Sequence, residues 1–252
     1  MTIHVNLELT DHCNLKCKMC SQSMRKLAHG EAMTFMDFST WKQGIDGLKN
    51  IDQEVAISPH WLGEPTLHPE FDRFISYAFE HNESNILFRE FKLHTNAVIF
   101  PKSRSQLLLK VAQNKAQAPN TFRFIHFSVD AFSPEVYKEV KGGNRREQVY
   151  DNIARFLQLR HNLNAAFPKV ALGFVVQPEN FHEARVFLEF WKYMIELYDN
   201  EVLICSDWPH QERDSIYFRP LNTKDQLKSN QLHRETVQQM GIPYTVRSSS
   251  SF

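Results

Sequence analysis

The chain has 252 residues, of which 42% are hydrophobic and 23% are charged. This composition is typical of a folded globular protein and excludes wholesale disorder. Lysine plus arginine and aspartate plus glutamate number 29 each, so the chain lacks the broad positive field that non-specific nucleic-acid binding needs. No apolar run approaches the roughly 20 residues of a membrane span, and the first residues show no secretory signal pattern. We therefore expect a cytoplasmic protein that binds neither nucleic acid nor a membrane.

Short apolar segments with the character of strands alternate with amphipathic helical segments along the chain. The expected strands are Ile3–Leu9, Glu54–Ser58, Leu87–Leu93, Phe122–Val129, Val170–Gln177 and Glu201–Cys205. The expected helices are 39–48, capped by Ser39, then 69–80, 102–115, one that Ser133 opens, 147–160, 181–197 and 223–240. Six successive strand–helix units predict an α/β fold with a parallel sheet, either open or curled into a partial barrel. In such folds the loops at the carboxyl ends of the strands carry the chemistry.

Three of the four cysteines, Cys13, Cys17 and Cys20, lie close together directly after the first expected strand. This spacing suits a metal site better than a disulfide framework. Thiolates bind both iron–sulfur clusters and zinc. Three thiolates hold three corners of a cubane and leave its fourth iron open, whereas a structural zinc site needs a fourth ligand, for which His12 and Cys205 are available. The ligand pattern alone leaves both kinds of site open.

The segment Cys13-Asn14-Leu15-Lys16-Cys17-Lys18-Met19-Cys20 resembles the CxxxCxxC loop of the radical S-adenosylmethionine (SAM) enzymes. The resemblance implies one [4Fe–4S] cluster on the three cysteines, with SAM chelated at the open iron. In that family, reductive cleavage of SAM yields a 5′-deoxyadenosyl radical that abstracts hydrogen from the substrate. Met19 stands where the family often has an aromatic residue, and its flexible thioether can pack on the adenine.

Further segments resemble SAM-binding elements of the same family, in the family's order and each near a strand end. Leu62-Gly63-Glu64-Pro65 is similar to the GGEP element, whose backbone and Glu receive the SAM ammonium, and Thr95-Asn96 is similar to the TNG turn. Ser128 and Asp130 resemble the S-x-D element that contacts the ribose and carboxylate, Lys141-Gly142-Gly143 resembles RGG, and the strand ending at Gln177 resembles the one that meets the adenine. The SAM-binding residues implied by the resemblance are Met19, Gly63, Glu64, Pro65, Thr95, Asn96, Ser128, Asp130, Lys141 and Gln177. Taken singly, each segment is equally explained as an ordinary turn, cap or strand end.

The resemblance also implies a partial (β/α)6 TIM-like barrel over residues 1–205, with residues 206–252 as a short C-terminal cap that shapes substrate entry and is not an independent domain. It relates the chain to the SPASM/twitch-type group, many of whose members carry auxiliary iron–sulfur clusters. After the three-cysteine loop only Cys205 remains, so we expect a single cluster. The expected partners are an electron donor such as flavodoxin or ferredoxin and a small-molecule or peptide substrate.

Cys205 ends the last expected strand and is therefore predicted to face the same mouth as the cysteine loop. A thiol there can donate a hydrogen atom to a substrate radical, as in the epimerases of this family, although a buried cysteine is often just a small hydrophobe. The preferred prediction is epimerisation of a carbon centre, with Cys205 as the catalytic hydrogen-atom donor. The alternatives are dehydrogenation or rearrangement of a polyol-like substrate and, outside enzymes, a zinc-stabilised binding module.

Sequence identifies the substrate only as a small polar molecule, of a sugar or aminocyclitol kind, or a peptide. Five polar side chains are expected near the mouth, and Trp61 offers a flat face for stacking. The five are His60, Asp207, His210, Arg213 and Arg219. Each is equally explained as a surface residue.

Overall fold

The computed structural model describes residues 2–21, 34–114, 121–198, 201–210 and 212–244. Seven strands form one sheet in the order β1-β2-β3-β4-β5-β7-β6, and every neighbouring pair is parallel. The strands are β1 (Thr2–Asn6), β2 (Glu54–Ser58), β3 (Glu90–Thr95), β4 (Phe122–Ser128), β5 (Lys169–Val176), β6 (Val202–Cys205) and β7 (Asp214–Pro220). The expected α/β fold with a parallel sheet is confirmed.

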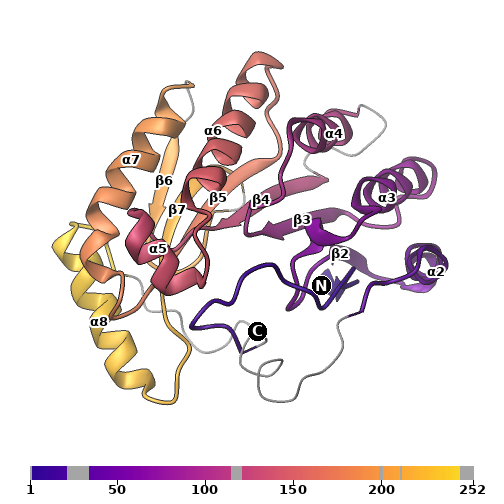
Figure 1. Cartoon of the computed structure of the whole chain (residues 1–252). Helices are drawn as coiled ribbons and strands as arrows, with labels where there is room; N and C mark the ends of the chain where they lie inside the picture. Colours follow the sequence, from indigo (N-terminus) through magenta and orange to yellow (C-terminus); the bar gives the residue numbers. More distant parts are fainter. Residues whose placement is uncertain (1, 22–33, 115–120, 199–200, 211, 245–252) are drawn as a thin grey trace.

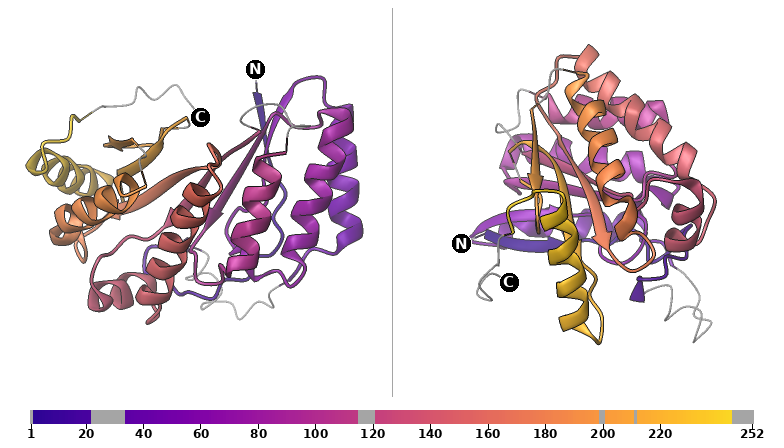
Figure 2. Two further views of the ribbon diagram at one scale, coloured as in Figure 1. Left: turned by 90° about the horizontal axis from the view of Figure 1, so that it is seen from above. Right: turned by 90° about the vertical axis from the view of Figure 1, so that its left-hand side faces the viewer.

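The helices lie around the outside of the curved sheet (Figures 1 and 2). They are α2 (Phe38–Gly47), α3 (Phe71–Asn85), α4 (Lys102–Ala112), α5 (Pro134–Lys141), α6 (Arg146–Asn162), α7 (Ala184–Glu196) and α8 (Gln226–Gln239). Neighbouring helices pack on one another from α2 through α3 and α4 to α6. This arrangement is the partial TIM-like barrel that was expected. Within the described residues, no helix is both long and apolar enough to cross a bilayer.

Two helix starts show how local sequence fixes these elements. Ser133 caps α5, accepting a hydrogen bond from the backbone N–H of Val136 at 3.3 Å, and the helix ends at Gly142 in the left-handed conformation (φ +70°). The start of α2 differs from the expectation, because the cap is Asp37 and not Ser39. Asp37 accepts from the N–H of Thr40 at 2.9 Å, and its carboxylate is the better acceptor for an exposed helix start.

The described residues form seven strands and not six, because β7 was expected to be part of the cap. β7 inserts between β5 and β6 and makes β6 an edge strand. Its first residue, Asp214, is buried and accepts hydrogen bonds from the N–H of Val170 and the Nη1 of Arg160, both at 2.7 Å. The segment after residue 205 therefore supplies a strand of the sheet as well as α8, and the boundary drawn after Cys205 runs through the sheet.

The two faces of the sheet differ in chemistry. The outer face is apolar and packs against the helices, through side chains such as Leu93, Phe127 and Phe174. The inner face carries His94 and His126, together with a small apolar group formed by Phe124, Ala171, Tyr217 and Cys205. Polar groups on an inner face are typical of a barrel whose interior binds a ligand.

Three histidines and a tyrosine form one connected array on this inner face. The Nδ1 atoms of His94 and His126 are 2.8 Å apart, and the Nε2 of His126 is 2.7 Å from the Tyr217 hydroxyl. The ring of His60 stacks on that of His94, with centroids 5.2 Å apart. A side chain at Gly173 would lie 2.5 Å from the Nε2 of His126, so glycine leaves the room for this hydrogen bond. Burial lowers the pKa of His60 to about 4 and holds those of His94 and His126 well below their ordinary value.

These pKa values predict a specific acid sensitivity. An unfolded histidine has a pKa of about 6.5, so below that pH the unfolded chain binds protons that the folded chain refuses. The free energy of unfolding contributed by His60 is therefore complete above about pH 6.5 and is lost as the pH falls toward its folded pKa of about 4. We expect His60→Gln to lose less stability than the wild type between about pH 7 and pH 5 in urea unfolding. His182→Gln, at an exposed position, is the matched control. An equal loss in the wild type and both variants would contradict the prediction.

Candidate active site

The loop that carries Cys13, Cys17 and Cys20 follows β1 and is fastened to the end of α5. The N–H of Lys16 donates to the carbonyl of Lys141 at 3.2 Å, and the N–H of Lys18 donates to the carbonyl of Val140 at 2.9 Å. A Cβ at Gly142 would overlap the carbonyl oxygen of Lys16. Glycine is therefore required at this position both for its positive φ and for this close approach.

The three thiols are half-buried, and the surroundings of Cys13 and Cys17 disfavour the charged form unless a cation is present. Burial raises the pKa of Cys13 to about 12 and also raises that of Cys17, while the nearby ammonium of Lys141 opposes both shifts. Thiolates are the form that binds iron, and a metal supplies the positive charge that stabilises them. The donor set therefore fits an iron–sulfur cluster, provided that iron takes the place of the thiol protons.

Several buried polar atoms around this loop have no hydrogen-bond partner among the described residues. They are the Nδ1 of His12 next to Cys13, the hydroxyl of Tyr137 on α5 and the Nε2 of Gln177 after β5. Tyr137 and Gln177 are at most 1% exposed. Buried donors without partners are costly, and a bound polar cofactor gives them partners. These atoms are a second sign that the residues fit a ligand at the loop.

Among the residues that the structure describes, no three His, Cys, Asp or Glu side chains converge closely enough to hold a single metal ion. Cys205, a possible fourth zinc ligand, instead packs with Phe124 and Tyr217 on the inner face of the sheet. A cubane does not require the three cysteines to converge on one metal ion, because each cysteine binds a different iron atom.

Glu64 joins the loop after β2 to the turn after β3. Its carboxylate, 3% exposed, accepts hydrogen bonds from the N–H and hydroxyl of Thr66 at 3.1 and 2.6 Å. It also accepts from the hydroxyl of Thr95 at 2.7 Å and the N–H of Asn96 at 2.6 Å. Burial raises the pKa of this carboxyl group, and the four donors oppose that shift. These contacts give Glu64 a structural task, and its direct contact with the SAM ammonium stays a prediction.

Asn96 carries this connection on to the cysteine loop. Its Nδ2 donates to the side-chain oxygen of Asn14 at 2.7 Å and lies 3.8 Å from the sulfur of Cys13. Gly63, the residue before Glu64, packs so closely on the loop that a Cβ there would overlap the carbonyl oxygen of Thr10. The predicted residues Gly63, Glu64, Thr95 and Asn96 are therefore brought together beside Cys13.

Glu8 is a site residue that no motif in the sequence indicates. Its Oε1 accepts hydrogen bonds from the N–H groups of Leu62 and Gly63, at 2.6 and 2.8 Å. Glu8 thus fixes the backbone of the loop after β2, which is also held by the buried carboxylate of Glu64. The sequence signal was weak, since Glu8 is simply an acidic residue just beyond the end of β1.

Ser128, Asp130 and Lys141 form a second group, on the other side of the cysteine loop. The Lys141 ammonium donates to Asp130 Oδ2 at 2.8 Å and to the carbonyl and hydroxyl oxygens of Ser128 at 2.9 and 3.0 Å. Asp130 Oδ1 accepts from the N–H of Val175 at 2.8 Å. Both side chains of the ion pair are 2% exposed. Asp130 thus orients Lys141 and ties β5 to the site, while Ser128 stays half-buried at the edge.

The remaining predicted residues are less tightly joined. Pro65 opens a short helix, Pro65–Leu67, and Met19 is half-buried in the cysteine loop. Gln177 is buried just after β5, and its backbone N–H donates to Asn180 at 2.9 Å. Among the described side chains, no hydrogen bond joins Met19 to the other predicted SAM-binding residues.

Cys205 lies on the inner face of the sheet, and that it faces the same mouth as the cysteine loop stays a prediction. It pairs in register with Tyr217, and the two side chains pack together. Burial raises the pKa of the Cys205 thiol, so it stays protonated at neutral pH. An S–H bond in this state is the form that a hydrogen-atom donor requires.

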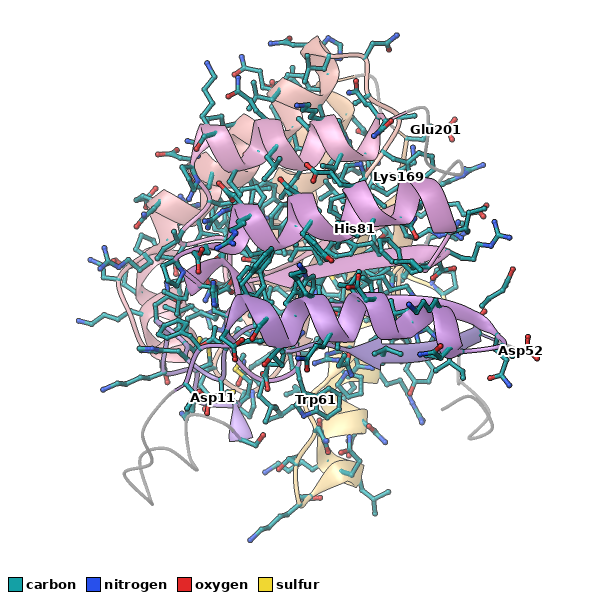
Figure 3. All side chains as sticks on the ribbon, turned by 90° about the vertical axis from the view of Figure 1, so that its right-hand side faces the viewer. Asp11, Asp52, Trp61, His81, Lys169 and Glu201 are labelled. Carbon is teal, nitrogen blue, oxygen red and sulfur yellow. The ribbon has the colours of Figure 1, made fainter. Side chains whose placement is uncertain are left out.

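The structure places the residues expected at the mouth in different parts of the molecule. His60 and Arg219 are half-buried on the inner side, and Trp61 is 60% exposed. The prediction for Arg213 is wrong, because it directly precedes β7 at the amino ends of the strands and pairs with Glu201 at 3.1 Å. Figure 3 shows the two ends of the molecule, with Asp11 beside the cysteine loop at one end and Glu201 at the other.

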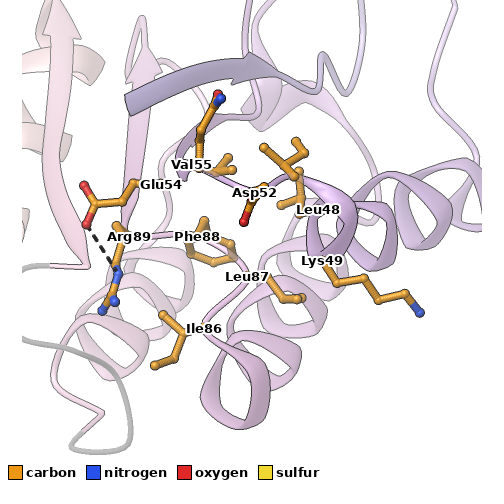
Figure 4. Close-up of a pocket in the computed structure, with 11 residues that line it drawn as sticks. Leu48, Lys49, Asp52, Glu54, Val55, Ile86, Leu87, Phe88 and Arg89 are labelled. Carbon is orange, nitrogen blue, oxygen red and sulfur yellow. Dashed lines mark ion pairs between the residues drawn. The ribbon is translucent and has the colours of Figure 1, made fainter. Parts of the chain in front are cut away.

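The cavity drawn in Figure 4 is not at this site. It has a volume of about 420 Å³ and lies among residues that precede β2 and β3, such as Asp52, Leu87 and Arg89. These residues mark the amino ends of the strands, whereas the cysteine loop follows the carboxyl end of β1. None of the predicted site residues lines this cavity.

Residues 7–190 match a family model described as the radical SAM superfamily. The chain is 26% identical over 185 residues to the S-adenosylmethionine-dependent nucleotide dehydratase of Selenomonas ruminantium, covering 73% of this chain and 60% of that protein. It is 23% identical over 159 residues to the GTP 3′,8-cyclase of Desulforamulus reducens, covering 62% of this chain and 43% of that protein. The chain therefore spans only part of the length of these relatives.

Among solved structures, native anSMEcpe with bound AdoMet superposes on the chain with a TM-score of 0.61 at 16% sequence identity, covering 98% of this chain and 64% of that one. At this identity the likeness shows the fold alone. The family match extends over most of the sheet and includes the cysteine loop. The chain belongs to the radical SAM superfamily, whose enzymes use a [4Fe–4S] cluster and SAM.

Proposed function

We propose that this radical SAM enzyme abstracts hydrogen from a carbon of a small polar substrate inside the barrel, and that Cys205 returns a hydrogen atom, so that the carbon centre is epimerised. The observation that carries the proposal is the position of the thiol. Cys205 is on the inner face of the sheet, in register with Tyr217, and its pKa is raised by burial. A protonated thiol facing the interior of the barrel is the group that this reaction needs.

We assign the cluster to Cys13, Cys17 and Cys20 and the SAM site to the residues gathered beside them. When bound, the cluster and SAM would supply a 5′-deoxyadenosyl radical, at the expense of one electron from the donor, to remove one hydrogen atom from the substrate. Glu64 and Glu8 hold the loop after β2 in place, and the backbone of this loop would receive the SAM ammonium. The pair of Asp130 and Lys141 holds Ser128 in place, where it would contact the ribose and carboxylate of SAM. Gln177, with its unpartnered Nε2, would contact the adenine.

The second half of the reaction belongs to Cys205. Its S–H bond breaks, the hydrogen atom forms a new C–H bond on the opposite face of the substrate radical, and the sulfur is left as a thiyl radical. One electron from a flavodoxin or ferredoxin and one proton from solvent restore the thiol. The substrate loses one hydrogen atom and gains one, so its redox state does not change.

Two further proposals concern the setting of the reaction. The electron donor implies a cytoplasmic location. We also propose that the segment after residue 205 shapes substrate entry.

A second candidate is the dehydration or rearrangement of a nucleotide or polyol. It is favoured by the relatives, one of which is a nucleotide dehydratase and another a GTP cyclase. In such a reaction Cys205 has no chemical part and serves only as a small apolar side chain of the barrel interior. The two candidates therefore make opposite predictions for a Cys205 variant.

Replacing Cys205 by Ala separates them. In heavy water the wild-type epimerase should place one solvent-derived deuterium at the inverted carbon, because the thiol exchanges its proton with solvent. Cys205→Ala should still form 5′-deoxyadenosine, while inverted product falls at least about 100-fold. Mass spectrometry and NMR of products from a panel of sugars, aminocyclitols and nucleotides provide the readout. A variant that turns over at the wild-type rate would exclude Cys205 as the donor.

The close packing of Gly63 on Thr10 predicts the effect of a small substitution. Gly63→Ala places a Cβ into the carbonyl of Thr10, so the loop after β2 must move away from the cysteine loop. We expect at least about tenfold weaker SAM binding, a loss of about 1.4 kcal/mol, measured by titration of reconstituted protein together with its iron content. Gly47→Ala is the matched control, because a Cβ at Gly47 meets no atom within 4 Å. If both variants bind SAM like the wild type, the SAM site assigned to this loop is wrong.

A further inference from the structure

Arg219 is an inward-facing cation of the barrel, close to Cys205. It follows Tyr217 by two residues on β7, and alternate residues of a strand share one face. Its guanidinium lies over the ring of Trp208, 5.5 Å from the centroid. The side chain is half-buried, and among the described residues it takes part in neither an ion pair nor a hydrogen bond.

Other cations of the same interior are neutralised by carboxylates. Lys92 and Arg123 both pair with Glu90 at 3.0 Å, and Lys141 pairs with Asp130 at 2.8 Å. A half-buried guanidinium without a protein acceptor can turn its N–H donors to a ligand, and a phosphate is a group that accepts them in pairs. The contrast points to an anion supplied from outside the chain.

The wall beside Arg219 carries neutral polar groups, and the carboxylate of Asp207 also acts on Tyr217 within it. Burial is the main reason that His94 and His126 stay neutral, and the charge of Arg219 adds to it. The same burial raises the pKa of the Tyr217 hydroxyl. Neutral imidazoles and a phenol bind hydroxyl groups without attracting or repelling charge.

The array also leaves one nitrogen available. If Tyr217 donates to His126, then His126 donates from Nδ1 to His94, and the proton of His94 lies on Nε2. If the chain runs the other way, the Nε2 of His94 is an acceptor. Among the described residues this nitrogen has no hydrogen-bond partner, so in either direction it offers one hydrogen bond to a ligand.

We propose that Arg219 and the His94–His126–Tyr217 array form one binding site for a polyhydroxylated organic phosphate, with the phosphate on Arg219 and a hydroxyl on the Nε2 of His94. The site deepens the proposed function, on which it rests only for the reaction that follows binding. Cys205 is in register with Tyr217, so a substrate held here lies beside the proposed hydrogen donor. Both nucleoside phosphates and sugar phosphates have this chemistry.

Calorimetric titration of the reconstituted holoenzyme with SAM bound tests the site without turnover. The probes are CTP, glucose 6-phosphate, inorganic tripolyphosphate and cytidine. The variants are Arg219→Gln, which removes the charge, and His94→Gln, which alters the hydroxyl contact. Arg213→Gln is the matched control, since Arg213 is an exposed arginine just before the same strand and pairs with Glu201. A circular dichroism melt of each variant checks that it is folded, and Arg219→Lys provides a milder change at the same position.

We expect Arg219→Gln to weaken the binding of an organic phosphate about 10- to 100-fold, as for the loss of a charged hydrogen bond, with Arg219→Lys between it and the wild type. His94→Gln should weaken the binding of CTP or glucose 6-phosphate but leave the binding of tripolyphosphate unchanged. Arg213→Gln should leave the binding of every probe unchanged. Preference between CTP and glucose 6-phosphate distinguishes the two sources of phosphate, with cytidine binding more weakly than CTP.

Two results would overturn the proposal. One is that none of the phosphate probes binds the wild type at about 1 mM, the upper end of common substrate affinities. The other is that Arg219→Gln binds them as well as Arg213→Gln does. Because binding is measured before any chemistry, loss of epimerisation in the heavy-water experiment leaves this result standing, and a failed titration leaves the role of Cys205 untouched.

Discussion

The organisation of the site depends on one buried carboxylate. Glu64 accepts four hydrogen bonds from Thr66, Thr95 and Asn96, and so locks the loop after β2 to the turn after β3. Through Asn96 the same connection reaches Asn14 and Cys13. A carboxylate buried with a full set of donors is rigid, because each donor would be left unsatisfied if it moved. The cysteine loop is thereby held in position by segments that follow the strands of the sheet.

Ion pairs and neutral hydrogen-bonding groups lie in different parts of the barrel interior. On the side of the cysteine loop the charges are paired, as in Asp130 with Lys141. Near Cys205 the inner face carries neutral histidines and a tyrosine, and the carboxylate of Asp207 also acts on that tyrosine. Arg219 is a cation without an ion-pair partner among the described residues. Arg219 offers a place to hold the substrate by a part that does not react.

Much of this was predictable from local sequence, and the reasons for the failures are physical. The alternation of strands and helices predicted the parallel sheet, Ser133 predicted a helix start, and the resemblance of the segment Cys13–Cys20 to a known loop indicated the family. β7 was missed because it follows β6 without an intervening helix and begins with a charged residue, Asp214, that is buried only through its pairing with Arg160.

Contacts between distant segments had no local signal. Glu8 binds backbone N–H groups 54 and 55 residues away. The meeting of His94, His126 and Tyr217 depends on the register of strands β3, β4, β5 and β7 and on the space left by Gly173.

The central claim is that three thiolates leave one iron of a [4Fe–4S] cluster open to SAM. Electron paramagnetic resonance of the reduced, anaerobically reconstituted protein tests it most directly. The account predicts a [4Fe–4S]⁺ signal that changes when SAM is added, and a protein without that signal, or with one that SAM leaves unchanged, would contradict it.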